Sequence, residues 1–265
     1  MTTTIGDAAI TVLGEPDPAA KVALTRRFAA AWACGDITTI GDAALPGRPA
    51  RPRVPELRRP REMPKRKTGH LAGRIAFVHA VTHIELNAID LAWDIVGRFT
   101  HENLPRDFYD DWIGVAKDEA EHFDMLSRRL VDMGSTYGDH PAHDGLWEAA
   151  EKTADDLLAR LALVPMVLEA RGLDTTPMAV KRLRDAGDDA SAEIFETIGR
   201  EEIPHVRAGV RWFEFICAKR GLDPVPEFHR LVTERFKGSL KAPFNEAARA
   251  EAEFAPHYYQ PMANP

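Results

Sequence analysis

Two short stretches of the chain repeat one arrangement of metal-ligating residue types. KDEAEHF and REEIPHV each contain Glu-x-x-His, as Glu119 and His122 in the first and as Glu202 and His205 in the second. Side chains three residues apart lie on one face of a helix, with about 5–6 Å between their Cβ atoms, so each pair can bind one ion. A single Glu-x-x-His is weak evidence in a glutamate-rich chain, and its repetition is much stronger evidence.

A further glutamate precedes each pair at almost the same separation. Glu85 lies 34 residues before Glu119, and Glu169 lies 33 residues before Glu202. Both are flanked by apolar residues, in the stretches HIELN and MVLEA, which is unusual for solvated helix positions. The pattern predicts two helical hairpins of one plan, each carrying Glu and then Glu-x-x-His.

The predicted ligand set is that of a di-metal carboxylate four-helix bundle, in which two helices carry one Glu each and two carry Glu-x-x-His. Four carboxylates and two imidazoles suit iron or manganese, with positions left open for oxygen chemistry. Bridging carboxylates offset the repulsion between two divalent ions about 3.5–4 Å apart. We expect two Fe ions, two Mn ions or one of each per chain, held by Glu85, Glu119 and His122 and by Glu169, Glu202 and His205.

By analogy with such sites, Glu119 and Glu202 are the expected bridging pair. The alternative for any one glutamate is a solvated helix position, since Glu121 lies close to Glu119 and Glu201 lies beside Glu202. The histidine three residues later selects Glu119 and Glu202 as the ligands.

Other polar and aromatic residues near the ligands each have two interpretations. His79 and His83, one turn apart, are either a further ligand or hydrogen-bond donor of the site, or satisfied core histidines. Asp118 either orients a ligating histidine or lies on the surface. Four aromatic residues are either redox relays or ordinary core packing: Tyr109, Tyr137, Trp93 and Trp112.

The first hairpin should consist of helices over residues 69–99 and 105–133. Pro105 suits the first turn of a helix, and Gly134 suits a C-terminal stop. The connection between them is short, so the two helices should be antiparallel neighbours.

The second hairpin should begin with a helix that starts near Thr153 and reaches Glu169. Pro165 should kink or loosen this helix, and Gly172 should end it. The Thr-Pro pair that follows would open a short helix to about Ala186.

The last helix of the predicted bundle covers residues 188–220 and stops at Gly221. Pro204 lies inside its Glu-x-x-His and should bend or bulge the helix at the metal.

A basic segment, here called the strap, covers residues 48–67. It holds nine Lys and Arg residues against Glu56 and Glu62, and prolines recur every third residue in and just before it, which favours polyproline II conformation. One interpretation is a strap held to an acidic bundle by ion pairs. The other is an arm for an anionic partner, such as RNA or a phosphorylated substrate.

The remaining segments should pack around the bundle. Residues 1–17 are expected to be loosely ordered or an edge structure, and no stretch favours β-structure. Short helices are expected at 18–34, 144–151 and 226–236. The predicted fold class is all-α, a four-helix bundle with extra terminal helices and the strap. Its predicted parts are 1–68, with the first helix and the strap, 69–220, the di-metal bundle, and 221–265, a C-terminal extension.

Composition excludes several classes of protein. The net charge of −7 argues against general nucleic-acid binding by the whole molecule. No apolar run approaches the 18 residues of a membrane span, and the N-terminus lacks the pattern of a secretory signal. Cys34 and Cys217 are too few for a disulfide framework. We therefore expect a cytoplasmic protein.

Four stretches resemble the ferritin-like superfamily, and closely its domain-of-unknown-function family 455: HAVTHIELNAIDLA, KDEAEHF, RLALVPMVLEARGLD and EEIPHV. The resemblance covers about 69–220 and the strap. It implies a ferritin-like bundle with a di-iron-type site and carries the metal role onto the six ligands named above. It names no substrate, because that family has no settled reaction.

The expected function is that of an oxidoreductase that activates O₂ or peroxide to oxidise or hydroxylate an organic substrate. That substrate would be a small molecule or, given the strap, a modified RNA base, and an oxygenase would need an electron donor. A homodimer is a further expectation. Rival functions on the same ligands are manganese catalase-like peroxide disproportionation and non-enzymatic iron binding or storage. A metal-free structural bundle is the last alternative.

Overall fold

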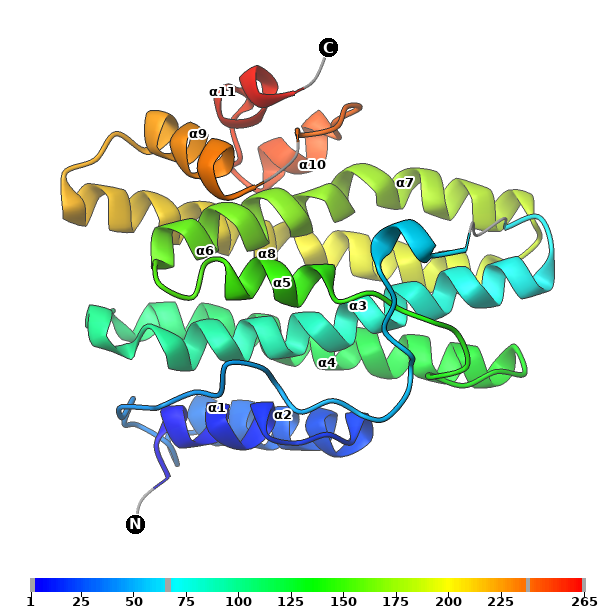
Figure 1. Cartoon of the computed structure of the whole chain (residues 1–265), viewed down its shortest axis with the longest axis horizontal. Coiled ribbons are helices and arrows are strands. Elements are labelled where there is room, and N and C mark those ends of the chain that lie inside the picture. Colours follow the sequence, from blue (N-terminus) through cyan, green and yellow to red (C-terminus); the bar gives the residue numbers. More distant parts are fainter. Residues whose placement is uncertain (1–2, 65–67, 237–238, 264–265) are drawn as a thin grey trace. The chain divides into compact units, whose positions relative to one another are not determined.

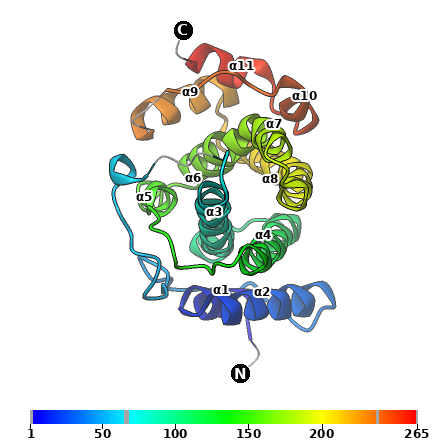
Figure 2. The same cartoon turned by 90° about the vertical axis from the view of Figure 1, so that its right-hand side faces the viewer.

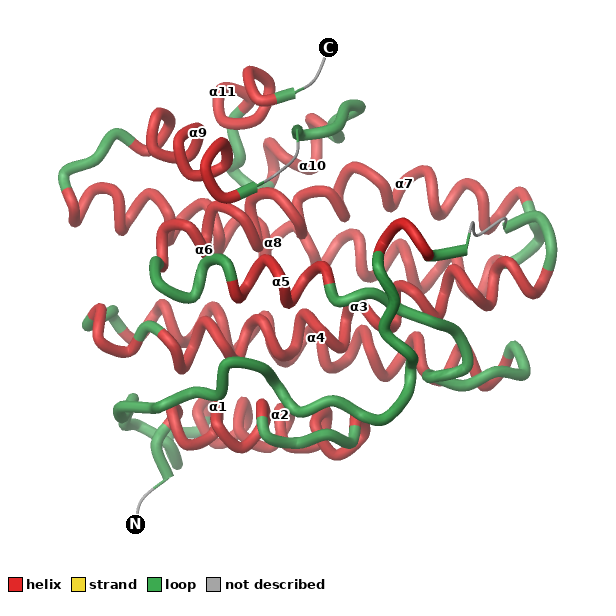
Figure 3. The backbone as a smooth tube through the Cα atoms, viewed as in Figure 1, coloured by secondary structure: helices red, strands yellow, loops and turns green. Residues whose placement is uncertain are grey.

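A computed structural model describes residues 3–64, 68–236 and 239–263 of the chain. These residues form helices joined by loops (Figure 3), and their only β-type pairings are the isolated bridges Leu57–Ala142 and Leu240–Ala263. The predicted all-α fold class is therefore confirmed. The chain divides into two compact units, Met1–Trp147 and Glu148–Pro265.

The first unit is built on one long helical hairpin. Helix α3 (Leu71–Arg98) and helix α4 (Arg106–Asp132) are joined by the short 3₁₀ turn η2 (Thr100–Glu102) and pack along their lengths (Figure 1). The predicted antiparallel pair is confirmed. Helix α1 (Ile5–Leu13) packs on α3, and helix α2 (Pro18–Ala33) packs on α4. Figure 2 shows both on one side of the hairpin.

The expectation of loose order over residues 1–17 is wrong, because α1 is a buried helix. Thr4 caps its N-terminus in a capping box with Asp7, which satisfies backbone donors that a short helix would otherwise expose. Its apolar side chains except Ile10 are buried, and the backbone N–H groups of Ile5 and Gly6 donate to carbonyls of Thr39 and Ile40, both at 2.9 Å. Contacts with a segment 34 residues away thus order this terminus.

Helix α3 is long and apolar enough to be compared with a membrane span. Its most apolar window has a mean hydropathy of 1.2, and 67% of that window is buried in the structure. The helix also carries Asp90 and Asp94, which are both buried and ion-paired. These features fit a core helix of a folded protein.

The strap is anchored to the first unit at one end and exposed at the other. Arg51 Nη1 lies 2.7 Å from Asp90 Oδ2, Lys21 pairs with the other oxygen of the same carboxylate, and Arg48 pairs with Asp144. These contacts support the ion-pair interpretation for the inner part of the strap. The outer part carries four exposed arginines: Arg53, Arg58, Arg59 and Arg61.

The backbone of the strap contains no long helix. A single 3₁₀ turn, η1 (Pro60–Glu62), is flanked by Arg59 at φ −66°, ψ 146° and Met63 at φ −70°, ψ 132°. Both pairs of angles lie in the predicted polyproline II region. Lys65, Arg66 and Lys67 lie outside the described residues.

The second unit contains the second hairpin and the C-terminal helices. Helix α5 (Gly145–Glu151) contains the last residues of the first unit and the first of the second. The first arm of the hairpin consists of α6 (Leu157–Leu163), a π-helix, η3 (Val164–Glu169), and α7 (Ala170–Asp185); the second arm is α8 (Asp189–Arg220). The extension comprises α9 (Pro224–Arg235), α10 (Glu246–Glu251), α11 (Pro256–Tyr259) and the 3₁₀ turn η4 (Gln260–Met262).

The predicted stop at Gly172 and restart at Thr176 are wrong, because α7 runs through both positions. Pro177 lacks an N–H and frees the carbonyl of Leu173, four residues earlier. The Asn245 side chain donates to that carbonyl at 3.1 Å. A residue of the C-terminal extension therefore satisfies the backbone group that Pro177 leaves without its helical partner.

The predicted loosening at Pro165 is confirmed, since η3 is a π-helix with Pro165 at its start and Glu169 at its end. The wide turn packs closely on α8. A Cβ built on Gly209 would lie 2.5 Å from Pro165 Cβ and 2.7 Å from its Cγ, so only glycine fits there. By contrast, α8 remains α-helical across Pro204, and the bulge predicted there is not present.

Replacing Gly209 by alanine should lower the free energy of unfolding by about 1–3 kcal/mol, because the new methyl group overlaps the rigid Pro165 ring in a packed core. Urea unfolding followed by circular dichroism measures this change. Gly172→Ala is the matched control: no described atom lies within 4 Å of a Cβ there. A helical Gly→Ala change at such a site should stabilise by about 0.5–1 kcal/mol. Equal effects of the two substitutions would contradict the close approach.

Candidate metal centre

The first unit brings three of the predicted ligands together in a buried triad. Glu85 comes from α3, and Glu119 and His122 come from α4. His122 Nδ1 lies 3.3 Å from Glu85 Oε2 and 3.4 Å from Glu119 Oε2. The three side chains are 3%, 1% and 0% exposed, and one ligand atom of each lies within 4.8 Å of the others. This group could hold a metal ion.

The charges of this first triad are unusual for a protein core. Burial raises the pKa of the Glu85 carboxyl well above its usual range, and the neighbouring Glu119 carboxylate raises it further. Burial alone would lower the pKa of His122, but its hydrogen bonds and charge attraction to Glu119 and Glu85 outweigh burial and raise that pKa to about 11. The imidazolium proton therefore holds the position between two carboxylates that a cation can take.

The second unit holds the other three predicted ligands. Glu202 and His205 are both buried on α8, with His205 Nδ1 3.7 Å from Glu202 Oε2. Glu169 is partly exposed at the end of the π-helix. The Oε2 atom of Glu169 is nevertheless buried.

The π-helix is the local feature that distinguishes the Glu169 arm. π-Helical turns occur mostly as single insertions in α-helices, frequently at functional sites. Pro165, the second residue of the wide turn, has no N–H to donate, and Gly209 of α8 makes room for its ring. Glu169 thus lies at the junction between the π-helix and α7.

The neighbouring glutamates are not part of these clusters. Arg26 binds Glu121 through two hydrogen bonds, of 2.8 and 2.6 Å, away from the triad. Glu201 is exposed. The side chain of Asp118 is 38% exposed, and its Oδ1 lies 4.0 Å from Lys117 Nζ. The selection of Glu119 and Glu202 by the histidine three residues later agrees with this geometry.

The two histidines of α3 contact the loop that follows α4. His83 Nδ1 lies 2.8 Å from the hydroxyl of Tyr137, and His79 Nε2 accepts from the backbone N–H of Gly138 at 2.8 Å. Both rings also stack on Tyr137, with ring centroids 5.3 Å apart for His79 and 6.1 Å for His83. Burial lowers the pKa of His83 to about 3, so this ring is neutral. Sequence reasoning gave no signal for these contacts, because Tyr137 lies in a loop.

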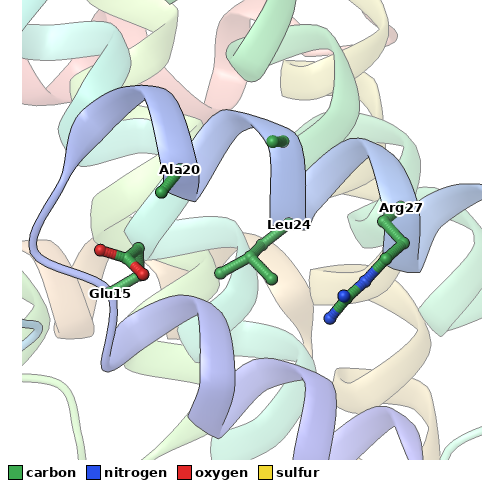
Figure 4. Close-up of a pocket in the computed structure, with 5 residues that line it drawn as sticks. Glu15, Ala20, Leu24 and Arg27 are labelled. Carbon is green, nitrogen blue, oxygen red and sulfur yellow. The ribbon is translucent and has the colours of Figure 1, made fainter.

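A surface hollow elsewhere on the first unit carries no comparable chemistry. Its volume is about 320 Å³, and it is lined by Glu15, Ala20, Ala23, Leu24 and Arg27 beside α2 (Figure 4). None of the predicted ligands reaches it.

The fold and the site define an all-α protein with a buried carboxylate–histidine cluster that could hold a metal ion. The chain belongs to the family described as "Protein of unknown function (DUF455)", whose model matches residues 14–260. It is 41% identical over 211 residues to an "Uncharacterized protein" of Haemophilus influenzae, across 78% of this chain and 73% of the relative. No solved structure matches. The predicted family membership is therefore confirmed.

Proposed function

We propose that this chain is a ferritin-like di-metal protein that binds two iron ions, or iron and manganese, and works as an oxidoreductase on O₂ or peroxide. The observation that carries the proposal is the first triad, in which Glu85 and Glu119 are buried within 3.4 Å of one imidazole nitrogen. Two carboxylates in a core are costly unless a cation or a proton compensates them. A bound metal ion would supply that compensation.

The second ion would be held by Glu169, Glu202 and His205. Support for this part comes from the repeated Glu and Glu-x-x-His pattern of the sequence and from the buried Glu202–His205 pair. Glu169 ends a π-helix, and π-helical turns occur frequently at functional sites.

When bound, iron or manganese would supply the electrons and the open coordination positions that reduce O₂ or peroxide. The chain would supply ligand charge and burial. Four glutamates balance two divalent ions, and the apolar surroundings exclude water from the reaction. The organic substrate would be a small molecule or a modified RNA base, the latter favoured by the exposed arginines of the strap.

Elemental analysis of the protein purified from unsupplemented cells tests the proposal. About two Fe or Mn ions per chain are expected. O₂ consumption with a reductant, and peroxide decay without one, then assay the metal-loaded protein. Rapid peroxide disproportionation with manganese would instead identify a catalase-like enzyme. Metal that is absent and is not restored by anaerobic Fe(II) would remove the proposal.

Metal binding to the first triad should release at least one proton per ion near pH 7, because a ligand histidine must be deprotonated and any proton on the Glu85 carboxyl, whose pKa burial raises, must also leave. His122, with its pKa of about 11, carries one such proton beforehand. Calorimetric titration with Mn(II) in buffers of different ionisation enthalpy counts the protons. The affinity should rise with pH in this range. An affinity that does not change with pH would contradict the charge assignment of the triad.

A further inference from the structure

An arginine of the C-terminal extension holds the first turn of α7, directly after Glu169. Arg249 of α10 donates to both carboxylate oxygens of Asp174, from Nε at 2.9 Å and from Nη2 at 2.8 Å. Its Nη2 also donates to the backbone carbonyl of Ala170 at 3.4 Å. Helix α10 packs on α7, as Figure 2 shows. One side chain of the extension is therefore bonded to the residue that follows Glu169 and to the next turn of the same helix.

A second residue of the extension reinforces this contact. The backbone N–H of Asn245 donates to Asp174 at 2.9 Å, and its side chain donates to the carbonyl of Leu173 at 3.1 Å. We call Asn245 and Arg249 the brace. The brace is bonded to α7 through side-chain and backbone groups within five residues of Glu169.

The arginine of the brace is fixed in one orientation. Arg249 is 3% exposed, and the side chain of Asp174 is fully buried. The guanidinium carbon lies 4.8, 5.2 and 4.4 Å from the ring centroids of Phe244, Phe254 and Tyr259. A buried ion pair often adds no net stability over apolar residues of similar volume, whereas a two-bond contact between arginine and carboxylate defines a geometry. Positioning is therefore the effect to expect from this pair.

The brace acts where the π-helix changes into an α-helix. The backbone N–H of Ala170 donates to the carbonyl of Pro165, five residues earlier, which is the hydrogen bond of a π-helix. From Ala170 onward the helix is α. Moving this junction by one residue would turn Glu169 about the helix axis by up to about 100°, the angle that one residue spans in a 3.6-residue turn. The bonds from the brace to α7 oppose such a shift.

We propose that the brace positions Glu169 for the second ion, so that Asn245 and Arg249 are positioning residues of the metal centre. This inference rests on the proposed function. Both residues act through the backbone of α7 and are not themselves ligands. Mutation of a group that orients a metal ligand typically costs about 10–100-fold in metal affinity, and a loss of this size is expected.

Removing the ion pair as a whole tests the brace without leaving a buried charge. The double variant Asp174→Leu with Arg249→Met puts apolar side chains in place of both charges, a replacement that protein cores often tolerate. Calorimetric titration of the metal-free protein with Mn(II) should show two binding steps, and Glu169→Ala identifies the step that belongs to the second ion. The double variant should weaken that step by about 10–100-fold and leave the other unchanged. Equal weakening of both steps, or of neither, would overturn the proposal.

Another arginine of the extension provides the matched control. Arg235 of α9 donates to both oxygens of Asp155, at 3.2 and 2.9 Å, but Asp155 lies 14 residues before Glu169. Arg235→Met should therefore leave both binding steps unchanged. A loss of the second step in this control would overturn the proposal, because general docking of the extension would then suffice.

Two further variants refine the test. Arg249→Lys keeps the positive charge beside Asp174 but loses the two-bond contact, so the affinity of the second step should lie between wild type and the double variant. If the double variant fails to fold, as judged by circular dichroism, Asn245→Ala decides. It removes the hydrogen bond to the Leu173 carbonyl and should weaken the same step. A wild-type affinity in folded Asn245→Ala would then contradict the brace.

Hydrogen exchange of the metal-free protein reads the brace without any ion. Backbone amides of residues 165–174 should exchange faster in the double variant and at the wild-type rate in Arg235→Met, because the brace opposes local opening of this turn. Equal exchange in the wild-type protein and the double variant would overturn the brace. A wild-type protein that holds no metal would remove the proposed function, and the exchange experiment would still decide whether the brace holds this turn.

Discussion

The double substitution Glu119→Ala and Glu202→Ala is expected to abolish metal binding, from about two ions per chain to nearly none. Each change removes a buried carboxylate that lies beside its histidine, at 3.4 Å in the first unit and 3.7 Å in the second. Mutation of a residue that hydrogen-bonds a metal ligand already costs roughly 10–100-fold in metal affinity, and loss of a ligand itself should cost more. Elemental analysis of the two purified proteins, prepared in parallel, measures the difference.

The adjacent glutamates provide a matched control for this experiment. Glu121→Gln with Glu201→Gln also removes two negative charges, within two residues of the ligands, but Glu121 faces Arg26 and Glu201 is exposed. This control should keep its metal content. Unchanged metal in the alanine double variant would contradict the proposed centre, and equal loss in both proteins would mean that only net charge matters.

The largest effect on stability is expected from Asp90→Asn. Asp90 is fully buried on α3 and compensates both Lys21, which is 2% exposed, and Arg51 of the strap. Removing one partner of a buried ion pair leaves an uncompensated charge and costs about 3–5 kcal/mol. Urea unfolding followed by circular dichroism measures the free energy of unfolding. A loss below about 1 kcal/mol, the range of exposed pairs, would contradict the role of Asp90.

The pH dependence of this variant has a definite sign. Burial lowers the pKa of Lys21 below its usual 10.5, and Asp90 opposes that effect. Without Asp90 the pKa of Lys21 in the folded protein falls further below that of the unfolded chain. Stability is then lost as pH falls below 10.5 and recovers as pH rises toward that value. Asp185→Asn is the control. Asp185 is 62% exposed and its partner Lys181 is 66% exposed, so little change in the free energy of unfolding is expected at any pH.

The errors of sequence-based reasoning share one physical cause. Helix α1 was missed because its order depends on backbone contacts with Thr39 and Ile40. The break expected at Gly172 and Pro177 is absent because Asn245, from the C-terminal extension, satisfies the carbonyl of Leu173. Local propensity cannot anticipate partners that lie 34 or 72 residues away in the chain.

The sequence by itself determined which residues share a helix face. Glu119 and His122, like Glu202 and His205, come together because helical geometry places residues three apart side by side. The apolar neighbours of Glu85 predicted its burial, and Pro165 predicted the irregular turn before Glu169. These inferences need only the period of a helix and the chemistry of one residue.

The tertiary structure alone decided how residues on different elements meet. Glu85 reaches His122 because α3 and α4 pack along their lengths, and Tyr137 reaches His83 because the loop after α4 folds back onto α3. Such contacts depend on distances and orientations between elements, which side-chain packing sets and which no local pattern in the sequence encodes.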